Sequence, residues 1–426
     1  MASFSIPLTG LEADSTALNT IANDLANMNT TAFKSQSTNF SDLFYQQIGS
    51  TGSGDPIQVG AGVKVAANET AFTQGTINST GNATDVALNG SGFFVLGSGN
   101  GAYELTRDGN FTQNANGNIV TSSGLNVMGY PAVNGVVNTD APLVPISIPV
   151  GQVQEPQATS SFGMTANLDA ASPAGTQFPA QLTLYDSLGE PHVATITYTE
   201  TAPNTWGYSV ALPAGDFTSG VSTPITGTLG FDSNGNLTTV TPTGGAAETV
   251  GAAAGDVSSI PLAFTGLADV SSNLNIQWNL LGPNGTPNIS QVDTASAVSS
   301  TTQNGYPSGQ YQSFSIGADG TVTVSYSNGQ LQNVGQAALA NVSNLQGLQL
   351  LGDGNYATTL ASGTASIGTS GTSGLATLQD GALESSNVNI SSEFSNLIIA
   401  QRAFEANAKS VTTFDTVTQD TINMVH

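Results

Sequence analysis

The sequence predicts an α+β fold that is mainly β, with an amphipathic α-helix at each end of the chain. Turn dipeptides such as Asn116-Gly117 and Asn328-Gly329 recur between short runs of Val, Ile, Phe and Leu, a pattern typical of β-hairpins. At both ends of the chain apolar residues recur with helical spacing instead. We therefore expect β-rich domains between two terminal helices.

The composition excludes several classes of function. Of 426 residues only 8% are charged, and 29 acidic residues against five Lys and Arg give a net charge of −24. Five cations cannot neutralise a run of phosphates, so we expect no nucleic-acid binding. No apolar run approaches the roughly 20 residues of a membrane span, so we expect no membrane insertion.

Few side chains could support catalysis or bind a metal. The chain has no cysteine, and its two histidines, His192 and His426, are interpreted as surface or turn residues. The stretch from Asp232 resembles a calcium loop, but Thr243 stands where a bidentate Glu is needed. Asn234-Gly235 is therefore interpreted as a hairpin turn. We expect no enzyme activity, no catalytic, cofactor-binding or metal-ligating residue, and no cofactor.

The first predicted helix starts at a capping box formed by Thr9 and Glu12. Its large apolar residues follow a heptad, which is typical of a narrow coiled-coil seam. The seam residues are Leu11, Leu18, Ile21, Leu25 and Met28.

The last predicted helix occupies the end of the chain, where no Gly or Pro occurs from Ser386 to Val425. Asn389 or Ser391 can cap it, and Glu393 falls in the first turn, where the helix dipole favours an acid. Its apolar seam contains Phe394, Leu397, Phe404, Ala408 and Val411.

Between the helices lie two β regions flanked by Gly- and Ser-rich stretches. Residues 46–62 and 361–374 are interpreted as loops or linkers. Asn89-Gly90 and Asp108-Gly109 are further predicted hairpin turns. In the second β region the period of two places four large residues on one face: Trp206, Tyr208, Val210 and Leu212. The helices could pack on these β regions or associate with copies of themselves, and the pattern leaves both open.

Six stretches carry a family resemblance. Residues 10–36, GLEADSTALNTIANDLANMNTTAFKSQ, and residues 381–411 are similar to the N- and C-terminal signatures of the axial proteins of the bacterial flagellum, the rod and hook family. Residues 73–96 and 105–130 resemble shared internal segments of that family. Two departures are Ala32 in place of a Gly and Ala83-Thr84 in place of a Pro-Leu pair. Residues 184–198 and 305–330 resemble its hook members most closely.

The resemblance implies a structural subunit of the flagellar hook. Such subunits self-assemble into a hollow, curved, flexible tube that transmits motor torque to the filament and passes exported subunits. For this chain it implies an outer β domain inserted into an inner one, and paired terminal helices that form the inner tube. The implied ranges are 1–32 and 385–426 for the helical domain, 33–70 and 365–384 for linkers, 71–149 and 296–364 for the inner β domain, and 150–295 for the outer domain.

The implied partners are further copies of the chain, the distal rod protein, the hook cap, the hook–filament junction protein and the flagellar type III export apparatus. The implied location is extracellular, in the hook and basal body, reached without a cleaved signal peptide. The start MASFSIPLTG agrees, since it has no basic segment followed by an apolar run. Two alternatives stay open: a distal rod protein, and a secreted β-rich glycan-binding protein with similar hairpins.

Overall fold

The computed structural model describes residues 5–97, 101–268 and 273–424, and the chain divides into two compact units. Unit 1 consists of residues 1–150, 313–325 and 331–426, and unit 2 of residues 151–312 and 326–330. Each unit has its own strands and its own buried core, so we describe them separately.

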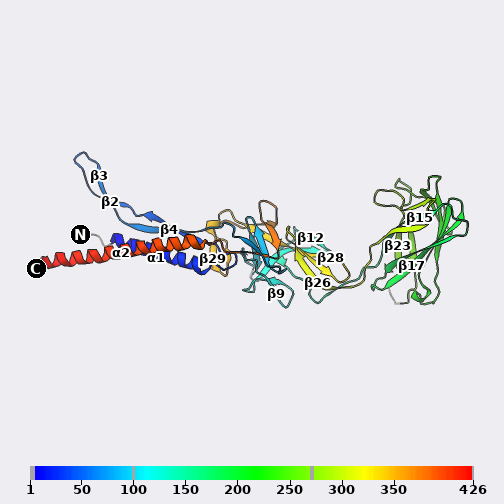
Figure 1. The fold of residues 1–426 in the computed structure, drawn as a ribbon, viewed down its shortest axis with the longest axis horizontal. Coiled ribbons are helices and arrows are strands. Elements are labelled where there is room, and N and C mark those ends of the chain that lie inside the picture. The colour runs from blue at the N-terminus through cyan, green and yellow to red at the C-terminus, as the bar shows by residue number, and fades with distance from the viewer. Residues whose placement is uncertain (1–4, 98–100, 269–272, 425–426) are drawn as a thin grey trace. The chain divides into compact units, whose positions relative to one another are not determined.

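Unit 1 contains the two predicted helices, α1 (Ser5–Ala26) and α2 (Ile390–Met424), which pack side by side (Figure 1). The predicted start of α2 is confirmed, because Asn389 Oδ1 accepts a hydrogen bond from the Ser392 N–H at 3.2 Å. The predicted capping box of α1 is wrong. Thr9 lies inside the helix, and its hydroxyl donates to the Ile6 carbonyl at 2.7 Å. Neither helix, over its described residues, is long and apolar enough to cross a membrane.

The predicted linker at residues 33–70 is instead an extended β structure, which we call the arm (residues 36–70). Strand β1 (Gln36–Asp42) pairs with β4 (Val63–Thr70), and β2 (Tyr45–Ser50) pairs with β3 (Pro56–Gly60), both antiparallel. Figure 1 shows the arm leaving the helix pair as a two-stranded ribbon. Its Gly- and Ser-rich centre forms the turn, in which Gly54 adopts a φ of +91°. The Gly- and Ser-rich composition therefore indicates a hairpin turn, but it does not reveal the strands on each side of that turn.

The prediction of a linker at residues 365–384 is also wrong, because this segment forms strands. It contains three strands, β31 (Ser366–Thr369), β32 (Thr377–Asp380) and β33 (Ala382–Glu384). They pair with β28 (Leu331–Asn341), β6 (Val86–Asn89) and β5 (Ile77–Ser79) respectively. The chain that leads into α2 is thus bound to the β part of unit 1.

The β part of unit 1 is built around a sheet in the order β27-β28-β11-β7-β8-β30-β29. Phe93 and Tyr356 meet in its core with ring centroids 5.5 Å apart. The remaining strands of this part are β7 (Phe93–Gly97), β8 (Tyr103–Thr106), β9 (Thr112–Gln113), β10 (Ile119–Val120), β11 (Asn126–Val133), β12 (Val136–Val137), β13 (Val144–Pro145), β27 (Thr321–Tyr326), β29 (Gln349–Gly352) and β30 (Asn355–Ala357).

The turn dipeptides predict hairpins with mixed success. Asn116-Gly117, Asn234-Gly235 and Asn328-Gly329 each lie between strands that pair with one another, as predicted. Asn89-Gly90 and Asp108-Gly109 do not, because the two strands on either side of each dipeptide pair with other strands and not with one another. A local turn signal therefore identifies a change of direction, and the tertiary fold decides the pairing.

Unit 2 is formed by two sheets. One is antiparallel in the order β16-β17-β18-β19-β20-β21, and the other has the order β22-β23-β15-β24, with β25 also paired to β15. Strand β26 (Gly309–Ile316) begins in the residue range of unit 2 and ends in that of unit 1. The strands of unit 2 are β14 (Val153–Gln154), β15 (Ser161–Asp169), β16 (Gln177–Tyr185), β17 (Pro191–Ala202), β18 (Thr205–Ala211), β19 (Ile225–Phe231), β20 (Leu237–Pro242), β21 (Glu248–Thr249), β22 (Ser259–Phe264), β23 (Leu274–Asn279), β24 (Ile289–Val292) and β25 (Ala297–Gln303).

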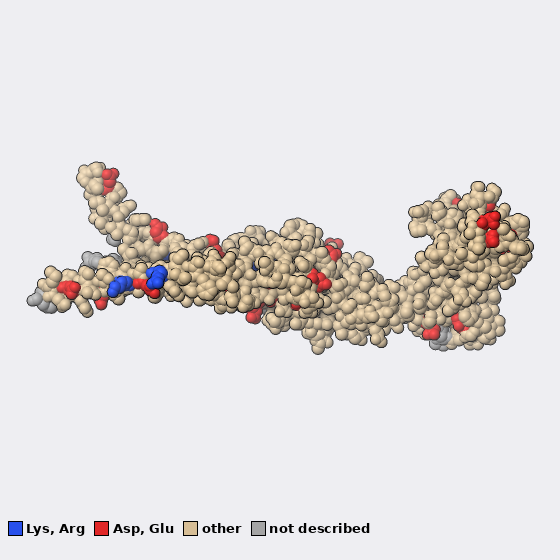
Figure 2. Space-filling model, in the orientation of Figure 1, with Lys and Arg blue, Asp and Glu red and all other residues tan. Residues whose placement is uncertain are grey.

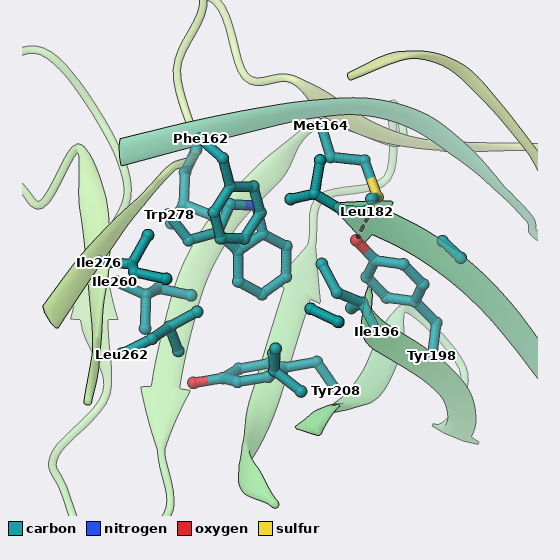
Figure 3. Close-up of a cluster of buried hydrophobic side chains, with 14 of the residues drawn as sticks. Phe162, Met164, Leu182, Ile196, Tyr198, Tyr208, Ile260, Leu262, Ile276 and Trp278 are labelled. Atoms are coloured by element: carbon teal, nitrogen blue, oxygen red, sulfur yellow. Dashed lines mark hydrogen bonds between the residues drawn. The ribbon is translucent and has the colours of Figure 1, made fainter. Parts of the chain in front are cut away.

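The core of unit 2 contains aromatic rings packed among Leu, Ile and Met side chains (Figure 3). Trp278 stacks on Phe162 at 5.8 Å between ring centroids, and Tyr208 meets it edge-on at 5.4 Å. The predicted shared face of the second β region is confirmed, since all four of its residues are buried here: Trp206, Tyr208, Val210 and Leu212.

The structure places the C-terminal end of this unit later than residue 295. Strand β25 pairs with β15 over residues 297–303, and unit 2 continues to Gln312. The sequence AVSSTTQ of β25 is short of large apolar residues, and most of it is exposed. It therefore lacks the alternation that would have assigned it to the core.

We expect Trp278→Ala to lower the free energy of unfolding of unit 2 by about 3–5 kcal/mol, because it empties a fully buried site. The chain's two tryptophans are both in unit 2, so fluorescence of the remaining Trp206 during urea unfolding reports on this unit. Val193→Ala on β17 is the control, as Val193 is 41% exposed. An unchanged midpoint in Trp278→Ala would contradict the assigned core.

Candidate assembly surface

Helix α1 buries its small residues. The buried positions follow a spacing of three and four, so they form one stripe along the helix. They are Pro7, Gly10, Ala13, Ala17, Thr20 and Asp24. Because none of these side chains is large, α2 and the arm can approach the α1 backbone closely.

At Gly10 the two helices lie close together. A Cβ atom at this position would lie 2.6 Å from Asn407 Nδ2, which is too close for any real contact. The same Asn407 amide donates to Asp14 Oδ2 at 2.8 Å. The absence of a side chain at Gly10 and the hydrogen bond between Asn407 and Asp14 therefore fix the alignment of α1 and α2.

The structure brings the two predicted seam-bearing helices together, but through this small stripe. Heptad positions 10, 17 and 24 precede the Leu seam at 11, 18 and 25 by one residue, a rotation of about 100°. The large seam residues consequently lie on the flank of the contact. Leu11, Leu18, Ile21, Leu25, Leu397, Ala408 and Val411 are half-buried, whereas Met28, Phe394 and Phe404 are exposed. The sequence does contain a signal for this small stripe. Gly10 and Ala17 are seven residues apart, as are Ala13 and Thr20, so small residues repeat with the same heptad spacing as the Leu residues.

Large apolar side chains are exposed along the helices and the arm. On the arm the exposed fractions reach 78% for Phe44 and 64% for Ile48, and on α2 they are 67% for Ile399 and 86% for Met424. Large apolar side chains exposed in such number on neighbouring elements favour a protein contact. The exposed residues are Phe40, Phe44, Tyr45, Ile48, Ile57 and Val59 on the arm, and Ile390, Phe394, Ile398, Ile399, Phe404, Val417, Ile422 and Met424 on α2.

The arm is attached to the C-terminal half of α1 by polar contacts. Asp24 Oδ2 accepts the backbone N–H of Gln36 at 2.8 Å, and the hydroxyls of Thr38 and Thr20 lie 3.1 Å apart. Asp24 is fully buried. Burial raises the pKa of Asp24 to about 6, the nearby charge of Glu393 adds to this effect, and the hydrogen bond from Gln36 opposes it.

Three buried charged residues join distant parts of unit 1, and we call them the clamp. Glu384 Oε1 accepts from Lys34 Nζ at 2.6 Å, and its Oε2 accepts from Arg107 Nη2 at 3.0 Å. The Gly75 N–H also donates to Glu384, and Arg107 donates to the Gly90 carbonyl. Burial, together with the charge of Arg107, lowers the pKa of Lys34, although Glu384 acts in the opposite direction. The clamp therefore fixes the segment after α1, the β part and the segment before α2 to one another.

The described residues contain no group of three or more His, Asp or Glu side chains placed to hold a metal ion. Asp232, at the stretch resembling a calcium loop, accepts the N–H groups of Asn234 and Asn236 and so stabilises the hairpin turn. Among the residues that the structure describes, no group of side chains is arranged as a catalytic site.

The interpretation of His192 as a surface or turn residue is wrong. It lies in β17 and is 4% exposed, with Nδ1 2.8 Å from Asp216 Oδ2 and Nε2 3.8 Å from Asp186 Oδ2. The two ring nitrogens point in opposite directions, so these carboxylates cannot share one metal ion with the ring. His192 instead links β17 to the turn at Asp186 and to the short helix Ala214–Asp216. His426 lies outside the described residues.

Comparison with known proteins identifies the family. The flagellar hook protein FlgE of Salmonella typhimurium is 34% identical over 436 residues, which cover 99% of this chain and 100% of the relative. The chain belongs to the flagellar hook protein family. FlgE of Treponema pallidum is 33% identical over 457 residues, with 98% of each chain covered. This family is a structural one, not a family of enzymes.

Family domain descriptions match four segments of this hook family member. They are the flagella basal body rod protein (7–34), the flagellar hook protein FlgE/F/G D1 domain (87–166), the flagellar basal body protein FlaE D2 domain (154–306) and the flagellar basal body rod FlgEFG protein C-terminal region (379–424). The crystal structure of Helicobacter pylori flagellar hook protein FlgE2 aligns with a TM-score of 0.53 at 15% identity. It covers 72% of this chain and 100% of that chain, a likeness of fold alone.

We expect Glu384→Gln to destabilise unit 1 by about 3–5 kcal/mol, because Lys34 and Arg107 would stay buried without a counter-charge. Hydrogen exchange of β7 measures the loss of protection. Glu405→Gln is the matched control, since its pair with Arg402 is solvent-exposed and should contribute little. Equal protection of β7 in both variants would show that the clamp does not stabilise the unit.

The buried carboxyl of Asp24 predicts a dependence on pH. Its pKa is higher in the folded state than in the unfolded chain, so the folded state binds more protons between about pH 4 and 6. Stability of the helix pair should therefore rise as the pH falls from 7.5 to 5. Thermal unfolding followed by helical circular dichroism measures this rise, and Asp24→Asn should reduce it. An identical pH dependence in Asp24→Asn would exclude Asp24 as its source.

Proposed function

We propose that this chain is a structural subunit of a flagellar hook, which polymerises into a hollow, curved, flexible tube. The tube transmits motor torque to the filament and passes exported subunits. The observation that carries this proposal is the exposed apolar surface of the helix pair and arm, which no other described part of the chain covers. Membership of the hook family supports the same function.

The two helices and the arm are the proposed assembly surface. The small stripe holds α1 and α2 together within a subunit, so their large residues are free to meet neighbours. Fully burying a Leu side chain contributes about 1.5–3 kcal/mol relative to leaving it exposed, and a polymer repeats this gain in each subunit. The proposed contact residues are the seam residues of α1 and α2, including Met28, Phe394 and Phe404.

We also propose the nested arrangement in which unit 2 is the outer domain, inserted into the β part of unit 1. The pairing of the first and last long strands of unit 2 supports it, because β15 and β25 run antiparallel side by side. An isolated β-bridge between Gln157 and Tyr306 also pairs the beginning of the inserted segment with its end.

Finer assignments rest on the family resemblance. They include contacts with the distal rod protein, the hook cap and the hook–filament junction protein. They also include export through the flagellar type III apparatus without a cleaved signal peptide, to an extracellular position. No feature of the described residues favours the distal rod protein or a glycan-binding protein over the hook subunit.

Leu18→Asp combined with Leu25→Asp should abolish polymerisation and leave the monomer folded, because both side chains lie on the flank of the helix contact. Negative-stain electron microscopy of concentrated protein counts the tubes, and circular dichroism checks the monomer. Leu188→Asp with Leu360→Asp is the matched control, at two exposed positions away from the helices. Normal tubes in the Leu18/Leu25 variant would remove this flank from the assembly surface, and an unfolded monomer would place it in the subunit core.

A further inference from the structure

The few basic residues of this acidic chain are unevenly distributed. Lys34 and Arg107 are buried in the clamp, which leaves Lys64, Arg402 and Lys409 as the exposed cations of a chain with a net charge of −24. On the face that Figure 2 shows, basic side chains gather on the helical part of unit 1, whereas acidic ones are scattered. Copies that associate must therefore overcome strong mutual repulsion with very few positive charges.

Arg402 and Lys409 form one basic ridge on α2. They are seven residues apart, so they share a helix face at a separation of about 10.5 Å. Ala400 and Asn407 pack toward α1. Arg402 follows Ala400 by two residues and Lys409 follows Asn407 by two residues, which is a rotation of about 200° around the helix. The ridge thus faces away from α1. The Arg402 side chain is 78% exposed and pairs with Glu405 on the same helix, at 3.0 Å.

A groove that contains two carboxylates lies on the helix pair. It has a volume of about 420 Å³ and runs between α1, α2 and β1. Asp14 and Glu393 line it from the two helices, and Ile21 and Ile399 supply apolar walls. Asp14 already accepts from Asn407, whereas Glu393 is half-buried next to open space.

The buried carboxylate of Asp24, which is bonded to the groove-lining Gln36, lacks its full set of hydrogen-bond partners. Asp24 is 0% exposed, and its Oδ1 accepts no hydrogen bond. It lies one helical turn beyond Thr20 and is bonded to Gln36, both of which line the groove. Because Glu393 adds a second negative charge nearby, a cation placed in the groove would stabilise both carboxylates.

We infer that the Arg402–Lys409 ridge of one copy seats in the Asp14–Glu393 groove of a second copy. This inference rests on the proposed function and names the contact that aligns neighbouring subunits. Ridge and groove are different surfaces of the same molecule, so the contact is heterologous and leaves an unused ridge and an unused groove at its two ends. Such a contact propagates into a ring or a helical polymer, whereas a self-complementary surface would stop at a dimer.

Complementary charge reversal tests the contact. The ridge-reversed variant carries Arg402→Glu and Lys409→Glu, and the groove-reversed variant carries Asp14→Asn, Glu393→Lys and Asn396→Lys. Asp14→Asn keeps an acceptor for Asn407. We expect each variant alone to need at least tenfold more protein than wild type to form tubes. An equimolar mixture should recover much of the loss, because each copy then meets a neighbour of opposite charge.

Gln181→Glu combined with Thr183→Glu is the control for added negative charge, since both residues are exposed on β16 of unit 2, outside the proposed assembly surface. Circular dichroism of each monomer separates misfolding from lost contact. Recovery in the mixture supports the pairing. Variants that polymerise like wild type, or folded variants that fail equally alone and mixed, overturn it and leave the proposed function standing. If wild-type protein forms no polymer under any condition, the proposed function fails together with the inference.

Discussion

Unit 1 depends on a single carboxylate, Glu384, because two buried cations from different parts of the chain share it. Lys34 follows α1, Arg107 lies in the β part, and Glu384 ends the last strand before α2. Burial makes these charges costly unless each is paired, so the three segments can meet in few other ways. The helices are thus joined to the β part by paired buried charges as well as by backbone pairing.

The helix pair is arranged differently from helices that cover a globular core. A core-facing helix usually buries its large apolar residues and exposes its polar ones. Here Gly10, Ala13 and Ala17 are inside, while Leu18, Phe394 and Phe404 lie at the flank or in solvent. The arm has the same property, with apolar side chains exposed on a two-stranded ribbon. A subunit of this design is folded, but its apolar surface is completed only by neighbours.

The sequence was sufficient for features that depend on local order. Both helices, the mainly β class and the turns at Asn116 and Asn328 follow from spacing and turn chemistry. It was insufficient where a distant partner decides the outcome. The arm resembles a linker because its turn is rich in Gly, and His192 is buried by Asp216 and Asp186, which no spacing reveals. The small stripe of α1 does not follow from the apolar sequence pattern, because large apolar residues define a predicted seam and this contact uses Gly and Ala.

The long sequence separation within the clamp has a consequence for the order of folding. Lys34 and Glu384 are 350 residues apart, so their ion pair closes a loop that contains nearly the whole chain. Contacts this distant form late, since loop entropy must be overcome before they stabilise anything. Unit 2 is almost continuous in sequence and can fold first. When the chain folds from its N-terminus, the clamp cannot fix α1 and the arm to the β part until the last tenth of the chain, which contains Glu384, is present. The complete assembly surface therefore forms last.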